Sequence, residues 1–323
     1  MQPSIETTIG NLLTQLAGEY PDREAVAYTD RPFRRTWKEL NQEEQLAKGL
    51  MALGIGKGDH LAVWATNVPE WLLMLFACMK IGVVLVTVNT SYKVFEMEYL
   101  LRQSDAKALL LIDGFKDANY IDIIHKLCPS LKDAQPGDLH EPMLPHLRTV
   151  IYAGEAQQPG MVRFSDLYTL SGQVSDKAFQ AVVDSLTPED IVNMQYTSGT
   201  TGFPKGVMLT HNNIVKNGYS IGEGMAFTPD DKLCICVPFF HCFGLVLAIM
   251  ACITHATSMV PVDAFSPLKV LKAVESERCT ALHGVPTMFI ALLEHPEFDR
   301  FDLSHLRTGI MAGSPCPVKV MQD

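Results

Sequence analysis

The sequence predicts an α/β protein with two open, mainly parallel sheets that are covered by helices. Segments with helical spacing alternate with short apolar runs, which is the order of βαβ units. The strand-like runs are apolar almost throughout, as expected for parallel strands that are buried on both faces. The chain has 323 residues, of which 47% are apolar and 19% charged, so it can bury a large core.

The first elements follow this order closely. Helical spacing begins in residues 42–53, and Gly54 is expected to end that helix. The alternation then continues through strand 60–65, helix 69–80, strand 83–88, helix 95–104, strand 108–112, helix 120–127 and strand 149–152. These elements predict a first sheet whose layer extends approximately over residues 55–195.

Polar connections separate this layer from a second series of elements. Residues 129–145 and 157–160 are rich in proline, glycine and charged side chains, and we predict that they are surface connections. After residue 196 the segments alternate again, over 212–218, 232–237, 244–253, 258–260, 267–276, 281–282 and 288–295. They predict a second sheet, in an approximate layer of residues 196–323 with 1–54.

The composition excludes several classes of protein. A net charge of −10 argues against a nucleic-acid surface, so no nucleic-acid partner is expected. The eight cysteines lack the spacing of a disulfide framework, and residues 1–10 show no secretory signal, so a cytoplasmic location is expected. Cys234, Cys236, His241 and Cys242 do not have a usual zinc spacing, and we predict no metal ligand among them.

Two long apolar stretches, 71–88 and 233–260, have the length of membrane spans. Residues 80–82 divide the first into a helix and a strand, and the turn 238–244 divides the second in the same way. No transmembrane segment is therefore expected. Peripheral contact with a membrane and the oligomeric state are left open.

Residues 196–207, which read YTSGTTGFPKGV, form the segment with the clearest chemistry. Glycines let backbone N–H groups turn toward an anion, hydroxyls add donors, and Lys205 after Pro204 adds a positive charge. A strand before and an apolar segment after place this loop at a sheet edge, where open α/β sheets bind ligands. The order Lys-Gly does not match the Walker A pattern, so an ordinary P-loop NTPase is excluded, although a plain Gly/Ser/Thr connector stays an alternative.

The segment resembles the phosphate loop of adenylate-forming enzymes, which include acyl-CoA synthetases, luciferases and peptide-synthetase adenylation domains. Two further motifs of that family follow in order, PFFHCFG at 238–244 and AGSP at 312–315. Upstream, TWKEL at 36–40, NVPEW at 67–71 and VNTSY at 88–92 resemble acyl-CoA synthetases, so the likeness covers nearly the whole chain.

The resemblance implies that residues 1–323 are a truncated form of the large N-terminal adenylation domain, with the C-terminal lid absent. The family's Tyr-Gly-x-Thr-Glu segment, its ribose-binding aspartate, its magnesium-binding glutamate and its lid lysine have no counterpart in this sequence. The chain is therefore expected to bind nucleotide but to form adenylate slowly.

The resemblance also implies a two-step reaction. A carboxylate attacks the α-phosphorus of ATP, which gives an acyl-adenylate and pyrophosphate, and the thiol of CoA then displaces AMP. ATP, Mg²⁺ and CoA are the implied cofactor and co-substrates. The expected catalytic residues are His241, Lys205 and Thr201, with His241 assigned to positioning and electrostatic stabilisation. The residues expected to hold the phosphates are Thr197, Ser198, Gly199, Thr200, Thr201, Gly202 and Lys205.

The remaining site residues come from the later motifs. Gly313, Ser314 and Pro315 resemble the turn that contacts adenine, although a plain turn after a strand is the alternative. The acid is expected to contact His241, Phe243, Val246 and Gly284, whose apolar surroundings are also typical of ordinary core.

A medium- or long-chain fatty acid is the expected substrate. An aryl acid such as benzoate, or a nucleotide- or adenylate-binding role without turnover, remain the alternatives.

Overall fold

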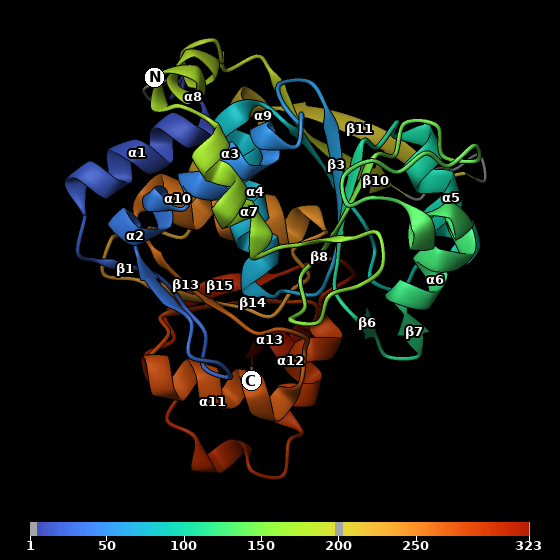
Figure 1. Cartoon of the computed structure of the whole chain (residues 1–323). Helices are drawn as coiled ribbons and strands as arrows, with labels where there is room; N and C mark the ends of the chain where they lie inside the picture. Colours follow the sequence, from blue (N-terminus) through green and yellow to red (C-terminus); the bar gives the residue numbers. More distant parts are fainter. Residues whose placement is uncertain (1–4, 198–202, 323) are drawn as a thin grey trace. The chain divides into compact units, whose positions relative to one another are not determined.

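The computed structural model describes residues 5–197 and 203–322, which fold into two compact units (Figure 1). Of the described residues, unit 1 contains 5–11, 42–197 and 203–213, and unit 2 contains 12–41 and 214–322. These limits differ from the approximate layers expected from the sequence. Residues 42–54 belong to unit 1 because helix α3 (Glu44–Ala52) packs on α4 (Pro69–Ile81). Residues 205–210 belong to it because their strand pairs with the strand that ends at Thr197.

Unit 1 is built on a seven-stranded sheet with the order β11-β10-β4-β3-β5-β8-β9. All neighbours are parallel except β10 and β11, which are antiparallel. The strands are β3 (His60–Trp64), β4 (Val84–Thr87), β5 (Ala108–Leu111), β8 (Thr149–Tyr152), β9 (Val162–Arg163), β10 (Ile191–Thr197) and β11 (Lys205–Thr210). The predicted mainly parallel sheet is confirmed for this unit.

The predicted helices of unit 1 are present in the predicted order, and four further helical segments between residues 129 and 184 are not predicted by the sequence. Besides α3 and α4 the helical elements are α5 (Val94–Gln103), α6 (Tyr120–Leu127), η1 (Pro129–Asp133), α7 (Asp166–Leu170), η2 (Ser171–Gln173) and α8 (Asp176–Asp184), and a small hairpin joins β6 (Gly114–Phe115) to β7 (Ala118–Asn119). Helices α1 (Ile9–Glu19) and α9 (His211–Gly224) each contain a boundary between the units.

Helix α4 shows how local residues fix an element. Pro69 occupies its first turn, where the missing N–H costs no hydrogen bond, and Gly82 ends it with a φ of 71°. Its residues are almost all buried, which explains the apolar stretch that has the length of a membrane span. In the described part of the chain, no helix is both long and apolar enough to cross a membrane.

The connection 129–145 is not the surface segment that its composition predicts. Leu131, Leu139 and Leu144 are buried in the core of unit 1, in the same cluster as Trp64 and Tyr120. Those two rings are stacked with their centroids 3.6 Å apart. The prediction of a surface connection is wrong for these leucines. Burial of their apolar side chains stabilises the fold even though the residues between them are polar.

Unit 2 is built on a six-stranded sheet with the order β15-β14-β12-β13-β1-β2, parallel except for the β1–β2 pair. Its strands are β1 (Glu24–Ala27), β2 (Arg34–Thr36), β12 (Lys232–Ile235), β13 (Ser258–Pro261), β14 (Ala281–Gly284) and β15 (Thr308–Met311). The second predicted sheet is confirmed, and β1 and β2 add strands from a part of the chain for which the sequence predicts none.

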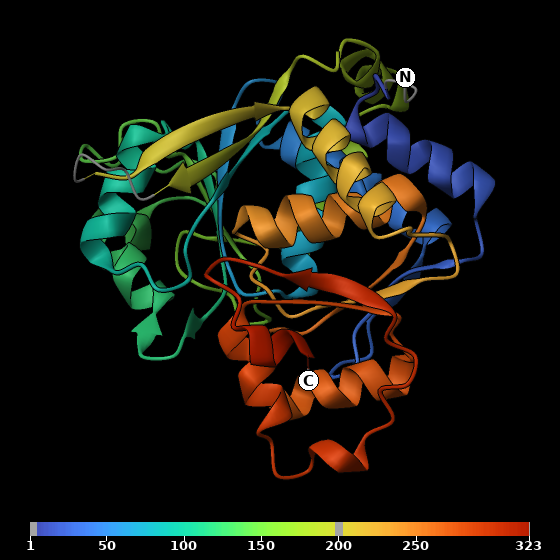
Figure 2. The ribbon, with the colours of Figure 1, turned by 180° about the vertical axis from the view of Figure 1, so that it is seen from behind.

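Helices cover both faces of this sheet, as predicted (Figure 2). Unit 2 includes the larger parts of α1 and α9 and also α2 (Trp37–Gln42), whose last residue lies in unit 1. Its other helical elements are the π-helix η3 (Phe243–Met250), α10 (Ala251–His255), α11 (Pro267–Glu277), α12 (Pro286–Leu293), η4 (Phe298–Arg300) and α13 (Val318–Gln322). Figure 2 shows α11 and α12 on one face of the sheet, with α9 and α10 on the other.

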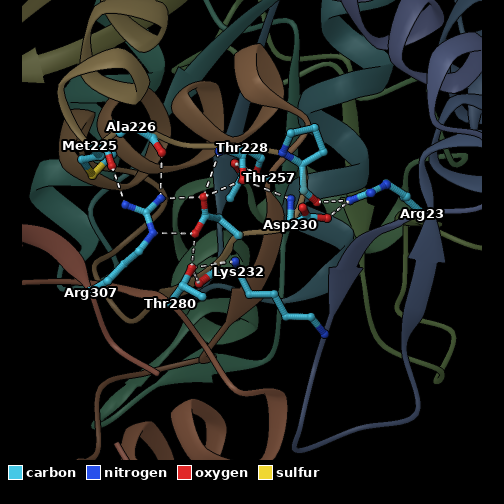
Figure 3. A network of polar contacts seen from close by, with 11 residues as sticks. Arg23, Met225, Ala226, Thr228, Asp230, Lys232, Thr257, Thr280 and Arg307 are labelled. Carbon is cyan, nitrogen blue, oxygen red and sulfur yellow. Dashed lines mark hydrogen bonds and ion pairs between the residues drawn. The ribbon is translucent and has the colours of Figure 1, made fainter. Parts of the chain in front are cut away.

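A polar network joins the amino ends of three strands of unit 2 (Figure 3). Asp231, which precedes β12, accepts two hydrogen bonds from Arg307, at 3.0 and 2.6 Å. It also accepts one from the Thr280 hydroxyl at 2.6 Å and two from Thr228, from its N–H at 2.9 Å and its hydroxyl at 3.0 Å. Arg307 donates further to the carbonyl groups of Met225 and Ala226. The buried carboxylate is therefore fully surrounded by donors.

Candidate functional site

The hairpin of β10 and β11 carries the predicted phosphate loop. Thr197 and Lys205 are Cα partners at the point where the two strands separate, and both residues are exposed. Strand β11 is the edge strand of its sheet. Five predicted loop residues lie outside the described residues and stay predictions: Ser198, Gly199, Thr200, Thr201 and Gly202.

Buried polar side chains join β10, the first strand of this hairpin, to its parallel neighbour β4. The Thr87 hydroxyl lies 3.2 Å from the Met194 carbonyl and 3.3 Å from Oε1 of Gln195. The Asn193 amide donates to the Leu85 carbonyl at 2.9 Å. These residues belong to none of the predicted motifs, although amides within an otherwise apolar strand are an available signal.

In unit 2, His241 lies in a tight turn between β12 and η3. Its N–H donates to the Pro238 carbonyl at 3.1 Å, and the N–H of Gly244 donates to the His241 carbonyl at 2.9 Å. A Cβ atom at position 244 would lie 2.2 Å from the Pro238 oxygen, which excludes any side chain there. Gly244 therefore allows the turn that places His241 on the surface of the unit.

The hydrogen bonds of His241 determine which ring nitrogen carries the proton. Nδ1 accepts a hydrogen bond from the N–H of Phe243 at 3.1 Å, so a neutral ring carries its proton on Nε2. Partial desolvation of the ring lowers the pKa of His241, although the residue as a whole remains exposed. The side chain is therefore prepared to donate a hydrogen bond through Nε2.

The π-helix η3 carries two of the residues predicted to contact the acid. Phe243 and Val246 are both buried. The ring of Phe243 lies 5.5 Å from that of His283, which directly precedes Gly284 on β14. His283 Nε2 donates to the Leu247 carbonyl at 3.1 Å, while its buried Nδ1 has no hydrogen-bond partner among the described residues. The structure thus brings Phe243 close to the strand that ends at Gly284.

The predicted adenine turn follows β15. Gly313 has a φ of +93°, in the region that favours glycine, and both Ser314 and Pro315 are exposed. The N–H of Ala312 donates to the Gly284 carbonyl at 3.2 Å, so the turn begins beside the end of β14.

The carboxyl ends of β12, β14 and β15 lead to His241, Gly284 and Gly313, and these strands are neighbours in the sheet. Three predicted segments therefore meet at the carboxyl edge of parallel strands, where ligands bind in such folds.

A separate apolar cavity of about 470 Å³ lies within unit 2. It lies among α11, α12, α13, β14 and β15 and includes none of Phe243, Val246 and Gly284 among the residues that line it. Among the described residues there is also no group of three or more histidine, cysteine, aspartate or glutamate side chains placed to hold a metal ion.

Two buried histidines make the stability of the fold dependent on pH. His211 Nδ1 accepts a hydrogen bond from the N–H of Ile9 at 3.1 Å, and burial lowers the pKa of both His211 and His283 from 6.5 to about 4. Since the folded state favours the neutral rings, each contribution is complete above about pH 6.5 and is lost as the pH falls toward 4. We expect the free energy of unfolding in urea to decrease over this range, by up to about 3 kcal/mol for each histidine.

Variants separate these histidines from the many carboxylates that also titrate. His211→Asn keeps an acceptor near Nδ1 and His283→Gln keeps a donor near Nε2, but neither side chain titrates. The decrease between pH 6.5 and 4.5 should be smaller in both variants than in the wild type. His140→Asn, at an exposed histidine, is the control. An unchanged pH dependence in both variants would contradict the prediction.

The fold and these strand-end segments define an AMP-binding enzyme. The family model of that description matches residues 13–323, and the chain belongs to this family. The resemblance to adenylate-forming enzymes is thereby confirmed.

Relatives with curated names support this membership. The chain is 54% identical over 323 residues to YngI of Bacillus subtilis (strain 168), provisionally an acyl-CoA synthetase. It is 39% identical over 324 residues to the medium-chain acyl-CoA ligase ACSF2, mitochondrial, of Danio rerio. The alignments cover 100% and 99% of the chain but only 59% and 53% of these relatives, so the chain spans little more than half of their length.

Solved structures agree in fold. The N-terminal domain of FACL13 from Mycobacterium tuberculosis has a TM-score of 0.79 at 24% identity, covering 98% of the chain and 72% of that structure. The anthranilate CoA ligase AuaEII in complex with anthranoyl-AMP has a TM-score of 0.82 at 23% identity, covering 98% of the chain and 57% of that structure. The predicted fold, that of the large N-terminal domain of adenylate-forming enzymes, is confirmed.

Proposed function

We propose that the protein is an AMP-forming acyl-CoA ligase. It activates a carboxylic acid with ATP to an acyl-adenylate and then transfers the acyl group to the thiol of CoA. The observation that carries the proposal is the hairpin at the sheet edge, where Thr197 and Lys205 face each other on either side of a Gly/Ser/Thr loop. Family membership and the named relatives support the same reaction class.

In this proposal Lys205 and the hydroxyls and backbone of residues 197–202 bind the β- and γ-phosphates. Charge develops on pyrophosphate as it leaves, and donors fixed in advance stabilise that charge without reorganisation. Lys205 contributes as a point charge at the mouth of the hairpin, and Thr201 is assigned to the same role. Magnesium enters as part of the MgATP substrate, and no described residue is assigned as its ligand.

His241 is proposed to orient the reacting carboxylate. A neutral ring with its proton on Nε2 donates a hydrogen bond to an anionic oxygen and does not need to transfer a proton. Gly313, Ser314 and Pro315 are assigned to adenine, which fits their exposed position after β15. Phe243, Val246 and Gly284 are assigned to the acyl group, and their apolar surroundings favour an aliphatic acid.

The name of the Danio rerio relative favours a medium-chain fatty acid, and a long-chain acid is the next choice. An aryl acid is retained as an alternative because one structure of similar fold is an anthranilate CoA ligase. We propose a cytoplasmic location, and the net charge of −10 offers no support for nucleic-acid binding.

The test is pyrophosphate release by the full-length gene product with ATP, Mg²⁺, CoA and a panel of acids. The panel contains fatty acids of graded chain length and benzoate. We expect pyrophosphate, AMP and acyl-CoA in equal amounts, with the highest kcat/KM for a medium-chain acid. A maximum with benzoate would transfer the assignment to the aryl-CoA ligases. Nucleotide binding without acid-dependent pyrophosphate release would reject the enzyme and favour a binding role.

A further inference from the structure

Helix α5 contacts both arms of the phosphate-loop hairpin. The Tyr99 hydroxyl donates to the Pro204 carbonyl at 3.0 Å, and its ring is stacked on Phe203 with centroids 5.3 Å apart. One helical turn later, Gln103 accepts a hydrogen bond from the Tyr196 hydroxyl. Residues four positions apart lie on the same face of a helix, so a single face of α5 holds the end of β10 and the segment that enters β11.

The helix is itself held firmly in the core of unit 1. Met97, Leu100 and Leu101 are buried in the cluster around Trp64, while the backbone N–H at the start of α5 is capped by Glu96. Tyr99 therefore projects from a rigid support toward the hairpin. Figure 2 shows this helix beside the start of β11.

The position of Lys205 depends directly on these contacts. The Pro204 carbonyl that accepts from Tyr99 belongs to the peptide bond whose nitrogen is that of Lys205. The next residue, Gly206, packs so closely on Met194 that a Cβ atom there would lie 2.8 Å from its sulfur. The backbone of Lys205 is thus held on one side by the contact of α5 with Pro204 and on the other by the packing of Gly206 against β10. The side chain of Lys205 itself is exposed.

We propose that Tyr99 is a positioning residue for ATP, which fixes Phe203 and Pro204 so that Lys205 meets the β- and γ-phosphates. This inference rests on the proposed function, because it assigns those phosphates to Lys205. It adds a residue that lies far from the phosphate-loop motif in the sequence. AMP lacks both phosphates, so its binding should depend on Tyr99 much less than the binding of ATP.

The experiment compares MgATP and AMP dissociation constants, measured by calorimetry on the full-length gene product. Tyr99→Leu removes both the ring and the hydroxyl, and we expect it to weaken MgATP binding about 3- to 10-fold. AMP binding should change less than about twofold. Tyr99→Phe keeps the stacking and should have a smaller effect on MgATP. Phe203→Tyr, which keeps a stacked ring, should remain close to the wild type, whereas Phe203→Leu should resemble Tyr99→Leu.

Phe95→Leu is the matched control, since it changes an aromatic residue on the same helix that is 68% exposed. It should leave both constants unchanged. If Tyr99 served folding alone, Tyr99→Leu would lower the melting temperature and would not weaken MgATP binding more than AMP binding. Equal losses for MgATP and AMP, or no loss in Tyr99→Leu and Phe203→Leu, would overturn the inference.

The result for the wild type separates this inference from the proposed function. If the wild-type protein releases pyrophosphate but Tyr99→Leu binds MgATP normally, only the role of Tyr99 is rejected. If the wild type binds no MgATP, the proposed function fails and the role of Tyr99 fails with it. If Tyr99→Leu does not fold, Tyr99→Phe and Phe203→Leu decide the question.

Discussion

Lys205→Ala is expected to weaken MgATP binding by about 10- to 100-fold, because it removes a charged donor from the phosphates. Hydrogen bonds to charged groups contribute about 1.5–3 kcal/mol, and each 1.4 kcal/mol is a factor of ten in affinity. Lys205 is exposed at the mouth of the hairpin, so its ammonium group is available to a ligand. AMP binding should change by less than about threefold, since AMP has neither a β- nor a γ-phosphate.

Two further variants make this test specific. Lys205→Arg keeps the charge and should recover part of the affinity for MgATP. Lys177→Ala removes another exposed lysine of unit 1, on α8, and should have no effect on either nucleotide. Equal losses of MgATP and AMP affinity in Lys205→Ala would show that the lysine does not contact the β- and γ-phosphates.

Asp231→Ala is expected to lower the free energy of unfolding by about 3 kcal/mol, which is the largest effect on stability that we predict for a single substitution. The substitution leaves Arg307, Thr280 and Thr228 without their shared acceptor. The value lies at the lower end for buried ion pairs because the Arg307 side chain is 41% exposed and can be partly hydrated. Urea unfolding, followed by circular dichroism, measures the difference.

The neighbouring aspartate provides a matched control. Asp230 forms an ion pair with Arg23 at 2.7 Å, but its side chain is 83% exposed, so Asp230→Ala should cost less than about 1 kcal/mol. Similar losses for the two variants would contradict the importance of the buried network.

The acid dependence of this network has a definite sign. Burial opposes ionisation of Asp231, yet the donors from Arg307, Thr280 and Thr228 outweigh it and keep the pKa of this carboxyl below its usual value. Its contribution is therefore complete above the ordinary aspartate pKa of about 3.9 and is lost as the pH falls below it.

The parts of the fold that the sequence predicted well have clear local signals. Pro69 and Gly82 mark the two ends of α4, and the apolar strands on either side are short and continuous. Strand β1 lacks such signals, because it is stabilised by parallel pairing with β13, where Val26 lies opposite Met259. The buried leucines of 129–145 were missed because their segment also contains many turn-forming and charged residues.

The segments of the proposed site could be selected from the sequence where motifs follow parallel strands. His241, Gly284 and Gly313 could be selected from the sequence, and the order of β12, β14 and β15 explains why their segments meet at one edge. The contact of Tyr99 with Phe203 could not be predicted, because it depends on where the packing of α5 places one face of the helix. The π-helical form of η3 was not predicted either, because π-helices are rare.

The close approach of Gly244 to the Pro238 carbonyl limits which positions near the proposed acyl site can be varied by protein engineering. Libraries directed at the proposed acyl site can vary Phe243 and Val246, but any residue with a Cβ atom at position 244 would displace the turn of His241. Such a library would then confuse a change of substrate with displacement of His241, which is proposed to orient the carboxylate. Position 244 should therefore remain glycine while its neighbours are randomised.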